Sequence, residues 1–304
     1  MSNRRLPVSA DAVCPSCGAR GVRRIGAIPQ SSEFAGRLLD EPFAPTDLCR
    51  CQECLLAFRW PLMDKAELDA LYRAGTTENW SPASAGPRPD WDLAAAWVAE
   101  SNPRADVLDV GCFDGGFAER LPTGLRPFGV EIHREAARHA AEHHGVEMVA
   151  DDFADLGNLE RTFDAVVAFD LIEHVHDPRE LVASLIEATA PGGSVIVGTG
   201  NVDAPTWRFE RGRYWYCWYP EHIAFISPRW AHRAAASLGL EVVRIQKFAR
   251  NPVRRRVLVE AAHNLAFLLL PQSLLRRLRR SPSDNPPIWA SSRDHVLVEF
   301  RRPS

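Results

Sequence analysis

The sequence lacks any long hydrophobic run. No segment of its 304 residues reaches the roughly 20 apolar residues that a transmembrane helix requires. The arginines near the amino terminus are not followed by an apolar stretch, so the pattern of a secretory signal peptide is also missing. We therefore expect a cytoplasmic protein, in which the seven cysteines serve as thiols or metal ligands rather than as disulfides.

An excess of charge of either sign is missing as well, because the formal net charge is only −3. This balance argues against a surface that grips nucleic acid, and residues 31–70 carry more acidic than basic side chains. The distribution is uneven, since residues 250–304 contain 11 arginines, no lysine and 4 acidic residues. We expect no nucleic-acid partner.

Four of the seven cysteines form two Cys-x-x-Cys pairs, which are Cys14, Cys17, Cys51 and Cys54. Each pair places two sulfur atoms on one tight turn, and two such turns provide the four thiolates of a tetrahedral zinc site. Cys49 is an alternative ligand to Cys51, although the spacing of Cys51 and Cys54 suits zinc better. The sequence therefore predicts a structural zinc ribbon over residues 1–60, with two pairs of ordinary thiols as the alternative.

Apolar strand patterns alternate with helical patterns between residues 105 and 250, which is typical of a doubly wound α/β sheet. The expected strands are 106–110, 126–131, 146–149, 163–169, 194–199 and 240–247. The expected helices between them are 115–121, 133–144, 178–190 and 227–238. Two further helical patterns, 62–74 and 90–100, lie within residues 61–104, which we interpret as a helical cap.

A glycine-rich turn follows the first expected strand and places backbone N–H groups before a helix, which is a common ligand-binding arrangement. Carboxylates follow the next strands, where this fold binds its ligands. Glu131, 20 residues after Gly111, suits the two hydroxyls of a ribose, and Asp152 with Phe153 suits an adenine. The expected cofactor contacts are Asp109, Gly111, Cys112, Phe113, Gly115, Glu131, Ile132, Asp152, Phe153, Phe169 and Asp170.

The spacing of the glycines distinguishes between two candidate cofactors, a nicotinamide dinucleotide and S-adenosylmethionine. A nicotinamide dinucleotide prefers G-x-G-x-x-G, with its pyrophosphate at the amino terminus of the helix. Here three residues stand between Gly111 and Gly115, and Asp114 would repel a pyrophosphate. Since an acidic turn suits a cationic ligand, the sequence favours S-adenosylmethionine as the cofactor.

Four segments resemble the motifs of class I S-adenosylmethionine-dependent methyltransferases, and they are residues 107–112, 129–131, 164–178 and 190–197. The resemblance covers about residues 105–250 and implies a seven-stranded Rossmann-like sheet with an antiparallel last strand at 294–301. One departure is Phe113, where the family usually has a second glycine. The paired cysteines before this domain are also similar to a subgroup that acts on sugars and glycan precursors.

Tyr219, Glu221 and His222 resemble a Tyr-x-Glu-His cluster that acts as base and orienting group in sugar C-methyltransferases. The similarity implies that His222 is the base that removes a proton from the acceptor, with His174 and His176 as second candidates. For each histidine, a hydrogen bond to the local backbone is the alternative.

Two segments beside the predicted sheet bear on the acceptor. Residues 207–219 are rich in aromatic side chains, which form either a stacking wall for a sugar ring or the core of a folded lid. Residues 251–290 interrupt the domain before its last strand, within 291–304, and combine an apolar stretch with a basic helical pattern. Residues 252–280 therefore either lie at a membrane surface, beside a lipid-linked sugar, or pack as a helical hairpin on the domain or on a second subunit.

These patterns together predict a methyltransferase that uses S-adenosylmethionine and carries a structural zinc. The expected acceptor is a hydroxyl group, or less favourably a carbon, of a sugar, nucleotide sugar or glycan precursor. An RNA base methyltransferase is a second interpretation, because zinc modules also precede such domains. A non-catalytic cofactor-binding scaffold is a third, motivated by Phe113 in the glycine turn.

Overall fold

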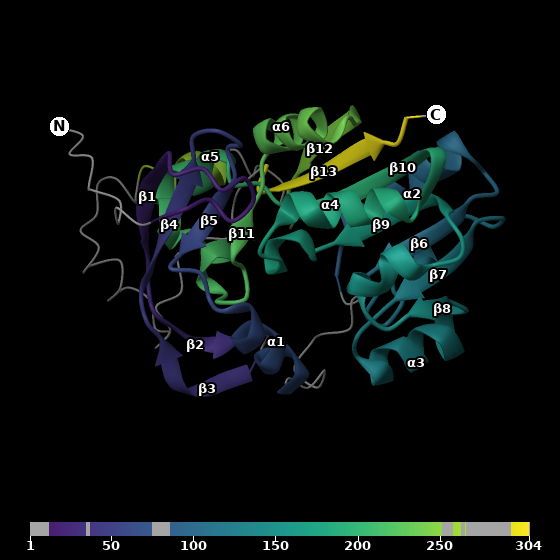
Figure 1. Ribbon diagram of the computed structural model, residues 1–304, viewed down its shortest axis with the longest axis horizontal. Helices are drawn as coiled ribbons and strands as arrows, with labels where there is room; N and C mark the ends of the chain where they lie inside the picture. The colour runs from purple at the N-terminus through teal and green to yellow at the C-terminus, as the bar shows by residue number, and fades with distance from the viewer. Residues whose placement is uncertain are drawn as a thin grey trace.

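The structure is a computed structural model that describes residues 12–34, 37–74, 86–250, 258–262, 265 and 293–303. These residues form a seven-stranded sheet and, beside it, a four-stranded sheet from the amino-terminal part of the chain (Figure 1). A two-stranded hairpin, β2 (Ser31–Phe34) with β3 (Arg37–Phe43), lies next to helix α1 (Lys65–Ala74). Phe34 of the hairpin packs edge-on against Tyr72 of this helix.

The seven-stranded sheet has the order β12-β13-β10-β9-β6-β7-β8. Its strands are β6 (Asp106–Val110), β7 (Arg126–Val130), β8 (Glu147–Ala150), β9 (Phe163–Phe169), β10 (Thr189–Gly200), β12 (Glu241–Phe248) and β13 (His295–Arg301). β13 runs antiparallel to both of its neighbours, whereas β10, β9, β6, β7 and β8 pair in parallel. The predicted doubly wound sheet with an antiparallel last strand is confirmed.

Helices pack against this sheet, and they are α2 (Pro89–Ser101), α3 (Arg134–His144), α4 (Pro178–Glu187) and α6 (Pro228–Leu238). Val107 belongs to the same apolar cluster as the buried side of α2. Its neighbour Leu108 belongs to the cluster of α4 and α6, on the opposite face. Because successive strand residues point to opposite faces, a sheet covered on both sides needs unbroken apolar runs, and the strands were predicted from such runs.

One predicted element is wrong. The helix expected at 115–121 is reduced to a single 3₁₀ turn, Ala118–Arg120. Leu121 has extended backbone and precedes Pro122, and the residue before a proline disfavours the helical region. The chain therefore leaves the glycine turn through a short connector instead of a full crossover helix.

The four-stranded sheet has the order β1-β4-β5-β11 and joins two distant parts of the chain. Its strands are β1 (Val22–Ile28), β4 (Thr46–Cys51), β5 (Ala57–Trp60) and β11 (Ala224–Phe225). β11 pairs antiparallel with β5, as the green and blue strands side by side in Figure 1 show. A strand from the later part of the chain thus completes the amino-terminal sheet.

Most of the insertion predicted at 251–290 lies outside the described residues. The membrane contact expected at 252–280 lies outside them too, except for residues 258–262 and 265. Leu258, in a short helical stretch, is exposed. Within the described ranges, no helix is both long and apolar enough to cross a membrane.

Candidate active site

The glycine-rich turn after β6 has backbone angles and close contacts that favour glycine. Gly111 and Gly115 have φ angles of +79° and +83°, in the left-handed region that favours glycine. A Cβ atom at position 115 would lie 2.9 Å from the Cβ of Ala140, so this glycine also lets α3 pack closely. Phe113 adopts φ +48°, at a cost of roughly 1–2 kcal/mol for a side chain in this region. The turn therefore keeps a left-handed backbone where the sequence has phenylalanine instead of the family's glycine.

Glu131 organises this turn from the end of β7. Its Oε2 atom accepts a hydrogen bond from the Phe113 amide at 2.9 Å, and its Oε1 atom accepts one from the His133 amide at 2.8 Å. Burial raises the pKa of Glu131, although these two amides oppose the shift. Each carboxylate oxygen has a second lone pair, so Glu131 retains the capacity to bind the two hydroxyls of a ribose.

A buried carboxylate and a guanidinium lie close enough to affect each other beside the turn. Burial raises the pKa of Asp109 to about 8, and Arg88 opposes this shift. Among the residues that the structure describes, none donates a hydrogen bond to the Asp109 carboxylate. A buried carboxylate without a donor favours a cation, so Asp109 and Arg88 fit the ammonium and carboxylate groups of an amino acid.

Two large apolar side chains are exposed at the carboxyl ends of β7 and β8. Ile132 directly follows Glu131 and is 47 % exposed, and Phe153 is 37 % exposed. The Asp152 carboxylate beside Phe153 accepts a hydrogen bond from the Ala154 amide at 2.9 Å. Since most side chains of this kind are buried, Ile132 and Phe153 are suited to cover the faces of an adenine. The residues present at this edge therefore fit S-adenosylmethionine.

Asp170, at the end of β9, belongs to a network of ion pairs. Its Oδ2 atom lies 2.9 Å from Arg250 and 3.2 Å from Arg88, which also pairs with Asp90 at 2.6 Å. Burial opposes ionisation of Asp170, but Arg250 and Arg88 outweigh it and lower its pKa. Arg88, Asp90 and Arg250 were not predicted. Arg88 and Asp90 are neighbours in the chain, but the pairs that Arg88 makes with Asp170 and that Arg250 makes with Asp90 and Asp170 join distant positions and leave no local pattern.

Two of the expected cofactor contacts have side chains that face the core. Phe169 packs against Phe117, with ring centroids 4.9 Å apart, and against Trp91 of α2. Cys112 is buried in a cluster with Ala140 and other apolar residues next to α3. Because both side chains pack in the core, we expect any cofactor contact of these two residues to come from their backbone atoms.

Glu173 is the centre of a buried polar cluster on the acceptor side. It accepts hydrogen bonds from the Thr199 hydroxyl, at 2.7 Å, and from the Tyr216 hydroxyl. Burial raises the pKa of Glu173 to about 7. Ligand atoms of Glu173, His174 and His222 all lie within 4.8 Å of one another, so the three side chains converge on one point.

His222 has a defined tautomer. Its Nδ1 atom lies 2.9 Å from the backbone oxygen of Tyr216, and a carbonyl oxygen can only accept, so Nδ1 carries the proton. Burial lowers the pKa of His222 well below its ordinary value, which keeps the ring neutral. The Nε2 atom is then an acceptor, which is the state that a general base requires.

The other expected catalytic residues surround this ring in different ways. The His174 ring lies 4.9 Å from the His222 ring, and its Nδ1 atom lies 2.5 Å from the Tyr72 hydroxyl. The Tyr219 ring lies 5.1 Å from His222, and Glu221, also buried, raises the pKa of His174 against the lowering effect of burial. The structure thus brings His174, Tyr219, Glu221 and His222 together, and Tyr72 joins them without having been predicted.

His176 does not join this group. Its Nε2 atom donates to the backbone oxygen of Met63 at 2.8 Å, which is a structural contact, although Met63 lies 113 positions away and not in the local backbone.

The aromatic segment 207–219 provides the core of a folded region. Trp207, Tyr214 and Tyr216 are buried together with Ile28 of the amino-terminal sheet. The rings of Trp207 and Tyr214 are stacked at 4.7 Å. The lid-core alternative therefore holds for these three residues, and an open stacking wall is wrong for them.

The four predicted metal ligands converge in the amino-terminal sheet. The sulfur atoms of Cys14, Cys17, Cys51 and Cys54 all lie within 4.8 Å of one another. The Cys14–Cys54 and Cys17–Cys51 sulfur pairs are each 3.5 Å apart. Four thiolates at 2.3 Å from a tetrahedral zinc would have edges of about 3.8 Å, so this group fits such an ion. Cys49 is buried outside the group.

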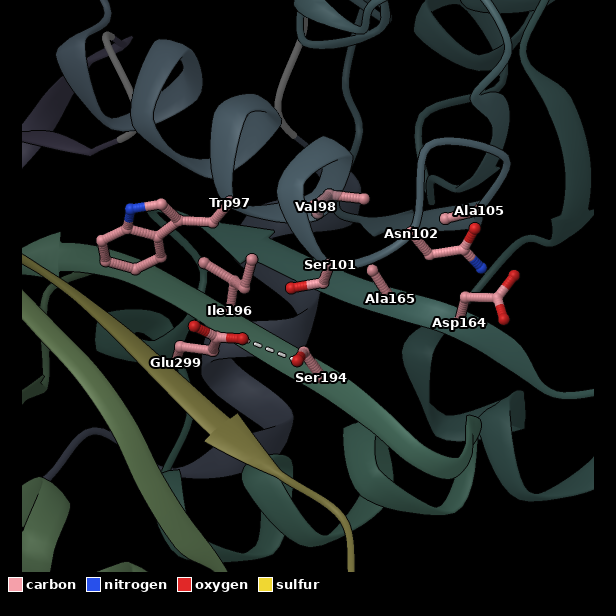
Figure 2. A pocket seen from close by; sticks show the side chains of 10 residues that line it. All are labelled: Trp97, Val98, Ser101, Asn102, Ala105, Asp164, Ala165, Ser194, Ile196 and Glu299. Carbon is pink, nitrogen blue, oxygen red and sulfur yellow. Dashed lines mark hydrogen bonds between the residues drawn. The ribbon is translucent and has the colours of Figure 1, made fainter.

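A cavity of about 20 Å³ lies elsewhere, between α2 and the sheet. Figure 2 shows Ser101, Asp164, Ser194 and Glu299 around it, with Ser194 donating to Glu299 at 2.7 Å. Asp164 and Ala105 mark the starts of β9 and β6, so the cavity is at the edge opposite the glycine turn. A volume of this size holds one water molecule at most, and we assign it no ligand.

Comparison with known proteins places this geometry in a family. A family model described as a methyltransferase domain matches residues 90–245, just over half of the chain. The ubiquinone biosynthesis O-methyltransferase of Thiobacillus denitrificans is 29 % identical over 200 residues, covering 58 % of this chain and 83 % of its own. Its counterpart from Idiomarina loihiensis is 26 % identical over 182 residues, covering 54 % and 72 %.

The chain also matches solved structures. The N-methyltransferase NodS of Bradyrhizobium japonicum, in complex with S-adenosyl-L-homocysteine, is 16 % identical, with a TM-score of 0.46. The likeness covers 78 % of this chain and 98 % of that one.

These findings correct the expected function. The relatives are named for O-methylation in ubiquinone biosynthesis, so the predicted sugar, nucleotide-sugar or glycan acceptor, and a role in carbohydrate biosynthesis, are wrong. The same names point away from an RNA base, and a match to an enzyme family overturns the scaffold interpretation. Because the family match covers more than half of the chain, from α2 into β12, and includes the cofactor edge described above, the chain belongs to the methyltransferase-domain family and is a class I S-adenosylmethionine-dependent methyltransferase.

Proposed function

We propose that this methyltransferase acts on a ring hydroxyl of a quinone precursor. The names of its relatives, O-methyltransferases of ubiquinone biosynthesis, support this acceptor class. The observation that carries the proposal is the neutral, buried His222, whose Nε2 atom is available as a proton acceptor beside Glu173. A phenolic hydroxyl has a pKa of about 10, so a weak buried base is sufficient to take its proton during methyl transfer.

The residues divide the work between cofactor and acceptor. When bound, S-adenosylmethionine would supply a methyl group activated by its sulfonium and leave as S-adenosylhomocysteine, and Asp109, Arg88 and Glu131 are the residues that would hold it. The Tyr216 carbonyl keeps the proton of His222 on Nδ1, so Nε2 takes the proton of the acceptor hydroxyl as the new O–C bond forms. Burial lowers the pKa of His222, but the Asp170 carboxylate opposes this shift and so favours the imidazolium that results.

The clustered cysteines are proposed to hold a structural zinc ion. The proposal is supported by the convergence of Cys14, Cys17, Cys51 and Cys54 and by sulfur separations of 3.5 Å. Four protein ligands leave no open position, so the zinc takes no part in the methyl transfer.

The test of the acceptor class is a methyl-transfer assay. S-adenosylmethionine with a labelled methyl group is offered together with a dihydroxybenzoate or, as the contrasting acceptor, a nucleotide sugar. We expect a labelled methyl ether of the benzoate, and a kcat that His222→Gln lowers by about 10²–10⁴. The affinity for S-adenosylhomocysteine should stay unchanged in that variant.

His232→Gln, an exposed histidine on α6, is the matched control and should keep wild-type turnover. Transfer to the nucleotide sugar alone, or full turnover by His222→Gln, would contradict the proposal.

A further inference from the structure

The amino-terminal sheet holds the acceptor side of the active site through one buried arginine. Arg59, on β5, is only 5 % exposed. One of its nitrogens, Nη2, donates to the backbone oxygens of Cys217 and Tyr219 at 2.6 and 2.9 Å. Its Nε atom donates to the backbone oxygen of His222 at 3.3 Å. The guanidinium thus binds three carbonyls of the loop that carries the proposed base.

The remaining contact of Arg59 ties it to its own sheet. Its Nη1 atom donates to the Thr46 hydroxyl of the adjacent strand β4 at 2.9 Å. Burial lowers the pKa of Arg59 to about 10, so it remains a cation at neutral pH. A buried cation needs several acceptors in fixed positions, and the planar guanidinium supplies donors in a rigid arrangement. The loop therefore has one orientation in which all of these bonds are made.

Backbone hydrogen bonds extend this connection to Glu173. The Arg59 amide donates to the Ile223 oxygen at 2.9 Å, next to the pairing of β5 with β11. The Ile223 amide in turn donates to the backbone oxygen of Glu173 at 2.9 Å. Ile223, the residue after His222, is thus fixed between β5 and the 3₁₀ turn Ile172–His174 that carries Glu173.

We propose that Arg59 is a positioning residue for methyl transfer, which sets the orientation of His222 through the carbonyls of its loop. This inference rests on the proposed role of His222 as the base. The cofactor contacts Asp109, Glu131 and Phe153 come from the other sheet, and Arg59 makes no contact with them. The rate of the chemical step therefore depends on the amino-terminal sheet, whereas cofactor affinity does not.

The experiment compares Arg59→Ala and Arg59→Lys with the wild-type full-length chain. A displacement of about 1 Å at a reacting group costs on the order of 10²-fold in rate, so we expect kcat to fall by about 10–100-fold in Arg59→Ala. The acceptor KM and the affinity for S-adenosylhomocysteine, measured by calorimetry, should change by less than about threefold. Arg59→Lys keeps the positive charge but loses the planar set of guanidinium donors, so its kcat should lie between those of Arg59→Ala and the wild type.

Chemical rescue separates positioning from a merely structural role. Added guanidinium at millimolar concentration should restore part of the kcat of Arg59→Ala and none of that of Arg59→Lys, whose side chain still occupies the space. Arg50→Ala is the matched control, because Arg50 lies on β4 and pairs with Asp203 at 2.9 Å without contacting the loop. It should lower thermal stability without lowering kcat.

The outcomes distinguish this inference from the proposed function. Wild-type kcat in Arg59→Ala with an inactive His222→Gln would overturn the role of Arg59 alone. Wild-type kcat in His222→Gln would overturn the role of the base, and the role of Arg59 with it. If Arg59→Ala does not bind S-adenosylhomocysteine, Arg59→Lys decides: wild-type kcat in that variant would also overturn the positioning role.

Discussion

At the scale of single residues, burial determines the charge states of the acceptor side. Burial raises the pKa of Glu173 from 4.5 to about 7, so the folded protein binds this proton more tightly than the unfolded chain does. The resulting contribution to stability is fully present below about pH 4.5 and is lost as the pH rises through 7. Glu173→Gln resembles the protonated form and is free of this loss.

The prediction is therefore a change in the pH dependence of unfolding. Glu173→Gln should match the wild type near pH 4.5 and exceed its free energy of unfolding near pH 8, by about 3 kcal/mol at most. Chemical denaturation at a series of pH values measures the difference. Glu142→Gln, at an exposed position on α3, is the control and should run parallel to the wild type. If the free energy of unfolding of Glu173→Gln also ran parallel to that of the wild type over this pH range, the raised pKa of the buried Glu173 carboxyl would be contradicted.

At the scale of elements, the glycine turn and α3 depend on each other. Gly115→Ala forces φ +83° on a side chain and places its Cβ 2.9 Å from Ala140. We expect it to lower stability by about 2–4 kcal/mol and to weaken S-adenosylhomocysteine binding at least tenfold, because α3 or the turn must move. Thermal unfolding and calorimetric titration measure the two effects.

Gly145→Ala separates the two causes. Gly145 ends α3 with φ +65°, and a Cβ atom there would have open space around it. This variant should lose only about 1–2 kcal/mol and keep its cofactor affinity. Equal affinities for Gly115→Ala and Gly145→Ala would show that the close contact with α3 plays no part in forming the turn.

At the scale of the whole molecule, the cysteine group is expected to hold the amino-terminal sheet together. The wild-type chain should contain one equivalent of zinc, and Cys14→Ser should lose it and unfold at a lower temperature. Elemental analysis and thermal unfolding, with and without a chelator, measure both quantities. Cys49→Ser, outside the group, should retain the metal. A purified wild-type chain without zinc would contradict the assignment.

The larger sheet was predictable because its signals are local. The run 163–169 was predicted with the same bounds as β9, since a strand buried on both faces shows as a continuous apolar run. Ser227 and Gly239, which cap α6, also act within one turn of the helix. The connector at 118–120 was mispredicted although its signal is local too, because the effect of Pro122 on the backbone of Leu121 was not taken into account.

The positions of the strands and the cofactor edge follow from periodicity, glycines and strand-end acids, so the sequence by itself determined the fold class and pointed to the methyl donor. The two Cys-x-x-Cys pairs likewise showed their partners through spacing. Only the tertiary structure decided how the acceptor side is built. Arg59 reaches His222 across 163 positions, and Arg250 reaches Asp170 across 80. Such contacts have no period or spacing in the chain, because their partners come from distant segments that meet only in the folded structure.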